Sequence, residues 1–114
     1  MWVEVGPNAM KKTTIREFAH DVRSKNAGPF WLTFEIFLRN REDYDTLVAL
    51  EVVTPALISR LYGTPPDQVQ IFFCANINII KISIPRPCIQ GSPQDKDVHA
   101  GQQSVFLANV EIEV

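Results

Sequence analysis

A turn with the sequence Arg23-Ser24-Lys25-Asn26-Ala27-Gly28-Pro29-Phe30 leads into the most apolar segment in the first half of the chain. Glycine allows unusual backbone angles, and proline fixes φ and has no N–H to donate, so this turn predicts where a strand begins. We expect the polar side chains of the turn to lie near the strand edge, where they can bind an anion. The alternative interpretation is an ordinary solvated loop between a helix and a strand.

The segment 31–39 after the turn alternates between apolar and mixed positions, as a half-buried strand does. One face is predicted to be core and carries Leu32, Phe34, Ile36 and Leu38; the other carries Trp31, Thr33, Glu35, Phe37 and Arg39. Two large aromatic rings are too much apolar surface to leave fully open to water. We therefore expect a homo-oligomeric interface on this second face, or a cover formed by residues 1–5.

A helix is predicted to precede the turn. Thr14 and Glu17 have the spacing of a capping box. Apolar residues follow at i, i+3, i+4 and i+7, which makes one buried helical stripe; they are Ile15, Phe18, Ala19 and Val22. After the first strand, Asn40 and Thr54 each fit the cap of a short helix, and Gly63 fits the end of the second.

Three more strands are predicted, over residues 69–75, 79–84 and 104–114, with a long loop before the last. This order of elements indicates an α+β, two-layer domain: a four-stranded, mainly antiparallel sheet with helices on one face. It becomes a ferredoxin-like variant if the long loop replaces the second crossover helix. We assign residues 1–12 to an N-terminal extension and residues 13–114 to this single α+β domain.

Composition excludes several classes of partner. The 114 residues carry a formal net charge of −2, which argues against binding nucleic acid or an anionic membrane surface. We find no run long and apolar enough to span a membrane and no signal peptide. The two cysteines lack the spacing of metal ligands. Because we find no export signal, we expect a cytoplasmic location and reduced thiols. We expect neither metal nor cofactor.

The loop 85–103 is long for so small a domain, and loops of this length are usually functional or disordered. Asp95 and Asp97 can transfer a proton, hold a hard cation, or pair with the basic residues of the first turn. His99 can act as acid or base. Gln102 and Gln103 can orient a substrate oxygen. The alternative is a solvated loop with no function of its own.

The two polar stretches together resemble a bacterial family catalogued as domain of unknown function 4387. The resemblance rests on the first turn with Leu32-Thr33, on Lys81 ahead of Ile84-Pro85-Arg86-Pro87, and on the motifs of the long loop, which are Gln90-Gly91-Ser92, Asp95, Asp97-Val98 and Gln102-Gln103. It covers the chain from about residue 13 to the end. The chain differs from the family pattern in carrying His99 where an aromatic residue is usual and Ser104 where a histidine is usual.

Members of this family are small proteins often encoded beside, or fused to, large proteins resembling AtuA, the acyclic terpene utilisation protein. Those large proteins end in a ferredoxin-like domain with a similar polar turn. The resemblance therefore implies a small partner subunit of an AtuA-like catabolic enzyme, not catalytic alone. Its substrate would be a small organic acid or its thioester, and the reaction a hydration, elimination or isomerisation. The alternative is a non-catalytic regulatory or scaffolding module that docks on the large subunit.

For the enzymatic reading we assign roles residue by residue. Arginine and lysine hold a carboxylate, and a carboxylate or imidazole moves a proton. The catalytic candidates are Lys25, Asp95, Asp97 and His99. The substrate-binding candidates are Arg23, Asn26, Arg86, Gln102 and Gln103. We expect five of these side chains to converge in space, and they are Arg23, Lys25, Asn26, Arg86 and either Asp95 or Asp97.

Overall fold

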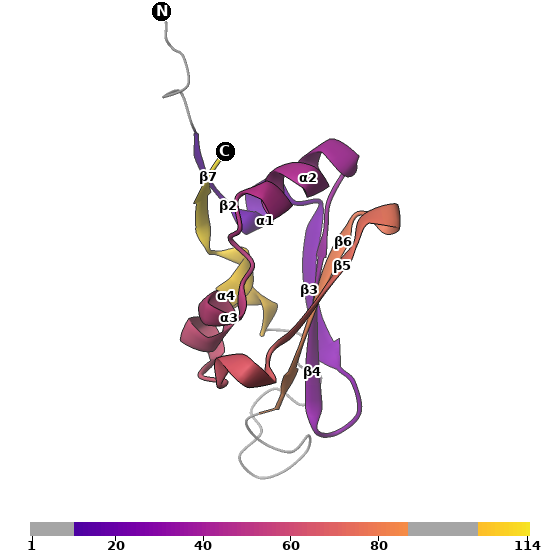
Figure 1. Ribbon diagram of the computed structural model, residues 1–114, viewed down its shortest axis with the longest axis vertical. Helices are drawn as coiled ribbons and strands as arrows, with labels where there is room; N and C mark the ends of the chain where they lie inside the picture. Colours follow the sequence, from indigo (N-terminus) through magenta and orange to yellow (C-terminus); the bar gives the residue numbers. More distant parts are fainter. Residues whose placement is uncertain (1–10, 87–102) are drawn as a thin grey trace, which may run out of the picture.

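The computed structural model describes residues 11–86 and 103–114. The fold is α+β: helices cover one face of a four-stranded antiparallel sheet, and a separate two-stranded sheet joins the two ends of the described chain (Figure 1). The strands of the larger sheet are β3 (Asp21–Asn26), β4 (Trp31–Phe37), β5 (Gln70–Cys74) and β6 (Ile79–Pro85). The smaller sheet pairs β2 (Lys12–Thr14) with β7 (Glu111–Glu113). The helices are α1 (Ile15–Phe18), α2 (Arg41–Ala49), α3 (Pro55–Tyr62) and α4 (Ser104–Ala108), with 3-10 turns η1 (Pro66–Gln68) and η2 (Ala75–Ile77).

The larger sheet has the strand order β3-β4-β6-β5, so two hairpins lie side by side and the helix pair α2–α3 connects them. The predicted alternation of β4 is confirmed. Phe34 lies opposite Ile82, and Ile36 opposite Ile80. All four side chains are fully buried, and they pack with the helices into one core. The opposite face of the sheet carries the mixed residues of β4.

The N-terminal helix prediction is wrong in length. Thr14 does cap a helix, because its Oγ1 accepts a hydrogen bond from the Glu17 N–H at 3.2 Å. The helix ends at Phe18, and Ala19 is already extended. Arg39 closes the short helix by donating to the Phe18 carbonyl at 2.7 Å. The segment expected to continue the helix is strand β3, which pairs along its whole length with β4.

The first turn is therefore the connection of a β-hairpin, not a helix-to-strand loop. Arg23 to Asn26 belong to β3. Gly28 adopts a φ of +78°, a left-handed conformation that glycine accepts readily. The N–H of Ala27 donates to the Trp31 carbonyl at 3.0 Å, which closes the hairpin. The polar residues that were expected in a loop are thus held in register on an edge strand.

The C-terminal strand prediction is also wrong in its first half. Residues 104–108 form α4, and only the short β7 follows. Leu107 and Ala108 are both buried although they are neighbours, whereas Phe106 is 56% exposed. A strand sends neighbours to opposite faces, so this pattern requires a helix. The fourth strand of the main sheet is β3 instead.

The helices after β4 begin and end as predicted. The Asn40 side chain accepts from the Asp43 N–H at 2.8 Å, and the Thr54 side chain accepts from the Leu57 N–H at 3.2 Å. Gly63 ends α3 with a φ of +75°, and its N–H donates to the Ser59 carbonyl at 2.8 Å. These caps fix the position of Tyr62, the last residue of α3.

Replacing Gly63 with alanine is expected to lower the free energy of unfolding by about 1–2 kcal/mol, because a Cβ disfavours the left-handed conformation. Among the described residues beyond its two chain neighbours, no atom lies within 4 Å of that Cβ, so the loss comes from backbone strain. Gly63→Asn is the matched control and should lose less, since asparagine tolerates this conformation. Urea denaturation measures both, and equal losses for the two variants would contradict the strain explanation.

Candidate functional site

The polar residues of β3 divide between the two faces of the sheet. Ser24 and Asn26 are half-buried on the face that the helices cover, while Arg23 and Lys25 are exposed on the opposite face. Strand geometry requires this split, because successive side chains point to opposite sides. The polar stretch therefore supplies two different groups of residues, one on each face.

The first group lies where β3 and β6 end and the described chain resumes at Gln103. We call it the strand-end cluster: Ser24, Asn26, Tyr62, Arg86, Gln103 and Ser104. The Arg86 guanidinium donates to Asn26 Oδ1, and the Arg86 N–H donates to the Phe30 carbonyl at 2.8 Å. The Ser104 N–H donates to Ser24 Oγ at 2.9 Å. Segments far apart in sequence are thus joined at one end of the sheet.

Tyr62 links this cluster to the core. Its hydroxyl donates to the Gln103 carbonyl at 2.6 Å and accepts from the Leu107 N–H at 3.2 Å. Its ring lies 4.6 Å from the ring of Phe34, centroid to centroid. Burial raises the pKa of the Tyr62 hydroxyl well above its usual range, and the hydrogen bond from Leu107 offsets this only in part. The phenol is therefore a neutral structural group at physiological pH.

The second group is a ladder of charges on the face away from the helices, which we call the open face. The register places Glu35 between Arg23 on one side and Lys81 on the other. Lys25 Nζ lies 3.5 Å from Glu35 Oε1, with Lys25 62% and Glu35 20% exposed. One half-buried carboxylate therefore lies among three cationic side chains.

Arg23 contacts two neighbouring side chains on the open face. Its Nε lies 2.7 Å from Asp21 Oδ2, and its guanidinium lies 5.4 Å from the centre of the Phe37 ring. The hydrogen bond from Arg23 is the largest cause that lowers the pKa of Asp21. Arg23 thus covers part of an aromatic ring that was expected to need a partner.

The expected convergence of site residues takes a different form. The structure brings Asn26 and Arg86 together and places Arg23 and Lys25 on the other face. Gln103 contributes its backbone carbonyl to Tyr62. The remaining candidates, Asp95, Asp97, His99 and Gln102, lie outside the described residues. Within residues 11–86 and 103–114, no three or more His, Cys, Asp or Glu side chains gather where they could hold a metal ion.

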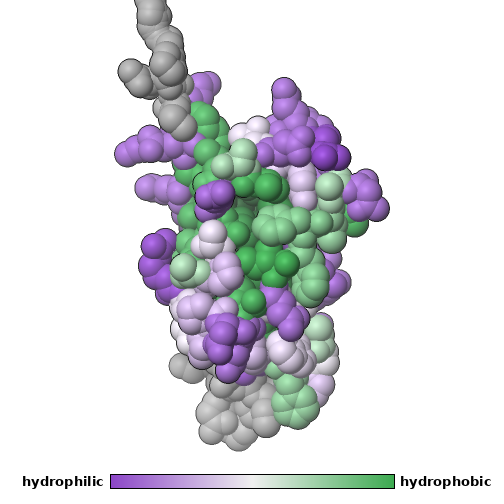
Figure 2. Space-filling model, in the orientation of Figure 1, coloured by the Kyte–Doolittle hydropathy of each residue, from purple (hydrophilic) through white to green (hydrophobic). Residues whose placement is uncertain are grey.

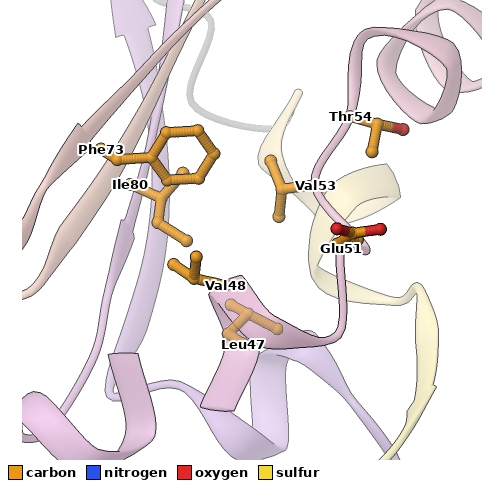
Figure 3. Close-up of a pocket in the computed structure, with 7 residues that line it drawn as sticks. All are labelled: Leu47, Val48, Glu51, Val53, Thr54, Phe73 and Ile80. Atoms are coloured by element: carbon orange, nitrogen blue, oxygen red, sulfur yellow. The ribbon is translucent and has the colours of Figure 1, made fainter. Parts of the chain in front are cut away.

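A pocket opens between the sheet and the connection from α2 to α3 (Figure 3). Its volume is about 310 Å³, and it is lined by Leu47, Val48, Glu51, Val53, Thr54, Phe73 and Ile80. The lining is mainly apolar, and Phe73 projects across the pocket from β5 (Figure 3). The residues of the strand-end cluster do not contribute to it, so this pocket is a separate feature.

Sequence reasoning missed Tyr62, Ser24 and Ser104 as members of the strand-end cluster. For Tyr62 a signal was present, because it stands four residues after Ile58 and so falls on the apolar stripe of α3. A tyrosine at such a position brings a hydroxyl that needs a partner once buried. The two serines carry no comparable signal, since their roles depend on the meeting of β3 and α4.

The family model described as "Domain of unknown function (DUF4387)" matches residues 15–111. The chain belongs to this family. For DUF4387 the matched region runs from the start of α1 to the start of β7 and so includes both groups of polar residues. No curated protein and no solved structure matches the chain. Among the described residues of this DUF4387 chain, no helix has the length and apolar character needed to cross a membrane.

Proposed function

We propose that this DUF4387 chain is a small subunit of an AtuA-like catabolic enzyme. It would help to bind the carboxylate of a small organic acid or its thioester. The contact between Arg86 and Asn26 carries the proposal, because it unites two residues named by the family resemblance. A guanidinium matches a carboxylate in charge and in planar, two-donor geometry. The strand-end cluster thus supplies a recognition group rather than a complete catalytic set.

The chemistry that we propose is a hydration, elimination or isomerisation completed by the large subunit. Asp95, Asp97 and His99 are our candidates for proton transfer to a substrate held at the strand-end cluster. Lys25 points to the opposite face of the sheet, so it is a candidate only for a substrate that reaches the open face. Lys25 lies on the open face beside Glu35, so we assign carboxylate recognition to Arg86 and Asn26 instead. The ferredoxin-like relationship to the terminal domain of AtuA-like proteins is part of the same proposal, supported by the likeness of the polar turn.

A purely docking role is the second candidate function. Its support is the number of large apolar side chains that the chain exposes, which is typical of interaction surfaces. They are Phe30, Trp31, Val48, Phe72, Phe73, Ile77, Val105 and Phe106. In this reading the charged residues would pair across an interface and take no part in recognising a substrate.

Arg86→Gln in a complex reconstituted with the AtuA-like subunit distinguishes the two candidates. Loss of hydrogen bonds to a charged group typically weakens an interaction by about 1.5–3 kcal/mol. We therefore expect kcat/KM for the small acid to fall about tenfold or more, mostly through KM. Arg41→Gln is the matched control, because Arg41 lies on α2 at the far end of the sheet and pairs with Asp45.

The same preparations must be checked for assembly by size-exclusion chromatography. An Arg86→Gln complex that assembles normally and keeps its full kcat/KM would reject carboxylate recognition at the strand-end cluster and favour the docking role. Lys25→Ala in the assembled complex tests the proposed proton transfer separately: an unchanged kcat would remove Lys25 from the catalytic candidates.

A further inference from the structure

Among the described residues, strand β5 forms an edge of the main sheet and carries none of the charges or prolines that usually protect an edge. Within the described part of the chain, β6 is the strand that pairs with it. Its sequence, Gln70-Ile71-Phe72-Phe73-Cys74, contains no charge and no proline. Phe72 is 47% and Phe73 52% exposed, on opposite faces of the strand. An edge of this kind is a template for another strand.

The other edge of the same sheet provides an internal comparison. β3 carries Asp21, Arg23 and Lys25, and charges of this kind hinder pairing with a further strand. As far as the described residues go, the β3 edge is protected by charges and the β5 edge is not. Strand-to-strand association is therefore favoured at β5. This edge is a different surface from the sheet face with Trp31 and Phe37, where the sequence predicted an interface.

We propose that two copies of this chain pair antiparallel through β5, about a two-fold axis at Phe72. The two sheets would then form one continuous sheet of eight strands. In this register Phe72 lies opposite Phe72, Ile71 opposite Phe73, and Gln70 opposite Cys74. No charged residues are opposed, and aromatic and β-branched residues meet as favourable cross-strand pairs. The strand is thus complementary to itself, as a two-fold interface requires.

The surface beside β5 extends the contact. Phe73 lies over the pocket together with Val48, which is 36% exposed, and Ile77 follows the strand at 57% exposure. Apolar side chains gather in this part of the surface, between the helices and the sheet (Figure 2). A pair of five-residue strands is marginal by itself. The partner's Ile71, placed beside Phe73, adds apolar contact at the rim of the pocket.

Charge substitutions at the two-fold axis test this arrangement in the full chain without any large subunit. Phe72→Lys and Phe72→Glu each place like charges directly opposite one another, so each variant alone should self-associate more weakly than the wild type. The loss should be about tenfold or more for Phe72→Lys and smaller for Phe72→Glu, because Lys81 of the same chain lies opposite position 72 and offsets the negative charge. An equimolar mixture of the two should regain the dimer, because lysine then opposes glutamate. Sedimentation equilibrium measures all three. Phe30→Lys is the matched control, because it replaces an exposed aromatic ring with a charge at a hairpin turn away from β5. This variant should remain dimeric.

A wild-type chain that stays monomeric at high concentration would overturn the proposal, as would charge variants that remain dimeric or a mixture that does not recover. The full chain could stay monomeric while a chain starting at Met10 dimerises. That result would mean that residues 1–9 block the β5 edge, and it would overturn the proposal for the full chain. Hydrogen exchange on the wild type is independent of any variant's folding. The amides of residues 70–74 that point away from β6 should exchange more slowly as concentration rises, and no change would reject the pairing. None of these outcomes depends on the proposed function.

Discussion

Phe34→Ala should lower the free energy of unfolding by about 3–5 kcal/mol, the range for removing a buried phenylalanine side chain. Phe34 is fully buried at the centre of β4. On one side it lies opposite Ser24 and on the other opposite Ile82, and its ring stacks against Tyr62. The cavity would therefore open where the sheet, α3 and the strand-end cluster meet, and neighbouring strands cannot close it without breaking their register.

Such a loss is a large fraction of the roughly 5–15 kcal/mol that stabilises a domain of this size. Urea or thermal denaturation followed by circular dichroism measures it. The matched control is Phe30→Ala, because Phe30 is 58% exposed and its removal should change stability by no more than about 0.5 kcal/mol. Similar losses for the two variants would show that β4 does not form the centre of the core.

Tyr62→Phe should lower the free energy of unfolding by about 1–3 kcal/mol, because it leaves the partly buried N–H of Leu107 and carbonyl of Gln103 without their shared partner. The ring and its contact with Phe34 are kept. The loss therefore reports on the hydroxyl alone. The expected secondary effect is loosening of α4, whose first turn depends on these bonds.

The same variant should also change how stability depends on pH. In the folded chain the pKa of Tyr62 is raised above its ordinary value of 10.0, mainly by burial. The folded state thus holds this proton more tightly than the unfolded state does. Its contribution to stability is complete below about pH 10 and is lost as pH rises through the folded pKa.

Wild type and Tyr62→Phe should therefore differ most near neutral pH and converge as the solution becomes alkaline. Tyr44, whose pKa burial also raises, is present in both proteins, so its effect cancels in the comparison. Urea denaturation at a series of pH values from 7 upward gives the two curves. Parallel curves above pH 10 would mean that the hydroxyl is not held as the structure shows.

Sequence patterns predicted the elements whose cause is local. The Asn40, Thr54 and Gly63 positions were recognised because a helix cap depends on one side chain or one left-handed residue. The alternation of β4 was recognised because both its neighbours are strands and one face is core. In these places local chemistry and tertiary packing favour the same structure.

Two predictions were wrong: the length of the N-terminal helix and the strand over residues 104–108. Both segments fit a helical and a strand pattern, so tertiary packing decides between the two. Ile15, Phe18, Ala19 and Val22 fit a helical stripe, but the segment from Asp21 also alternates as a strand. β3 pairs with β4 over six residues, and a longer α1 would leave that edge of β4 without a partner strand. In the C-terminal segment, alternation at Phe106 and Ala108 competed with the helical spacing of Ser104, Leu107 and Ala108, and the buried set is the helical one.

The candidate site was predictable only in part for the same reason. The sequence motifs alone were enough to name Asn26 and Arg86 as site candidates. In the structure the two side chains are hydrogen-bonded to each other. Placing Lys25 with them assumed a loop, in which side chains can turn the same way. A strand separates neighbouring residues onto opposite faces, so this error follows directly from the misassigned helix.

The small sheet of β2 and β7 has a consequence for how this unit can be connected to other chains. Lys11 and Val114 exchange two backbone hydrogen bonds of 2.9 Å, so both ends of the described fold leave from one place (Figure 1). A domain with adjacent ends can be inserted into a surface loop of a host or circularly permuted with a short linker, without crossing its own core. The described fold can therefore be joined to another chain at both of its ends without rearranging its core.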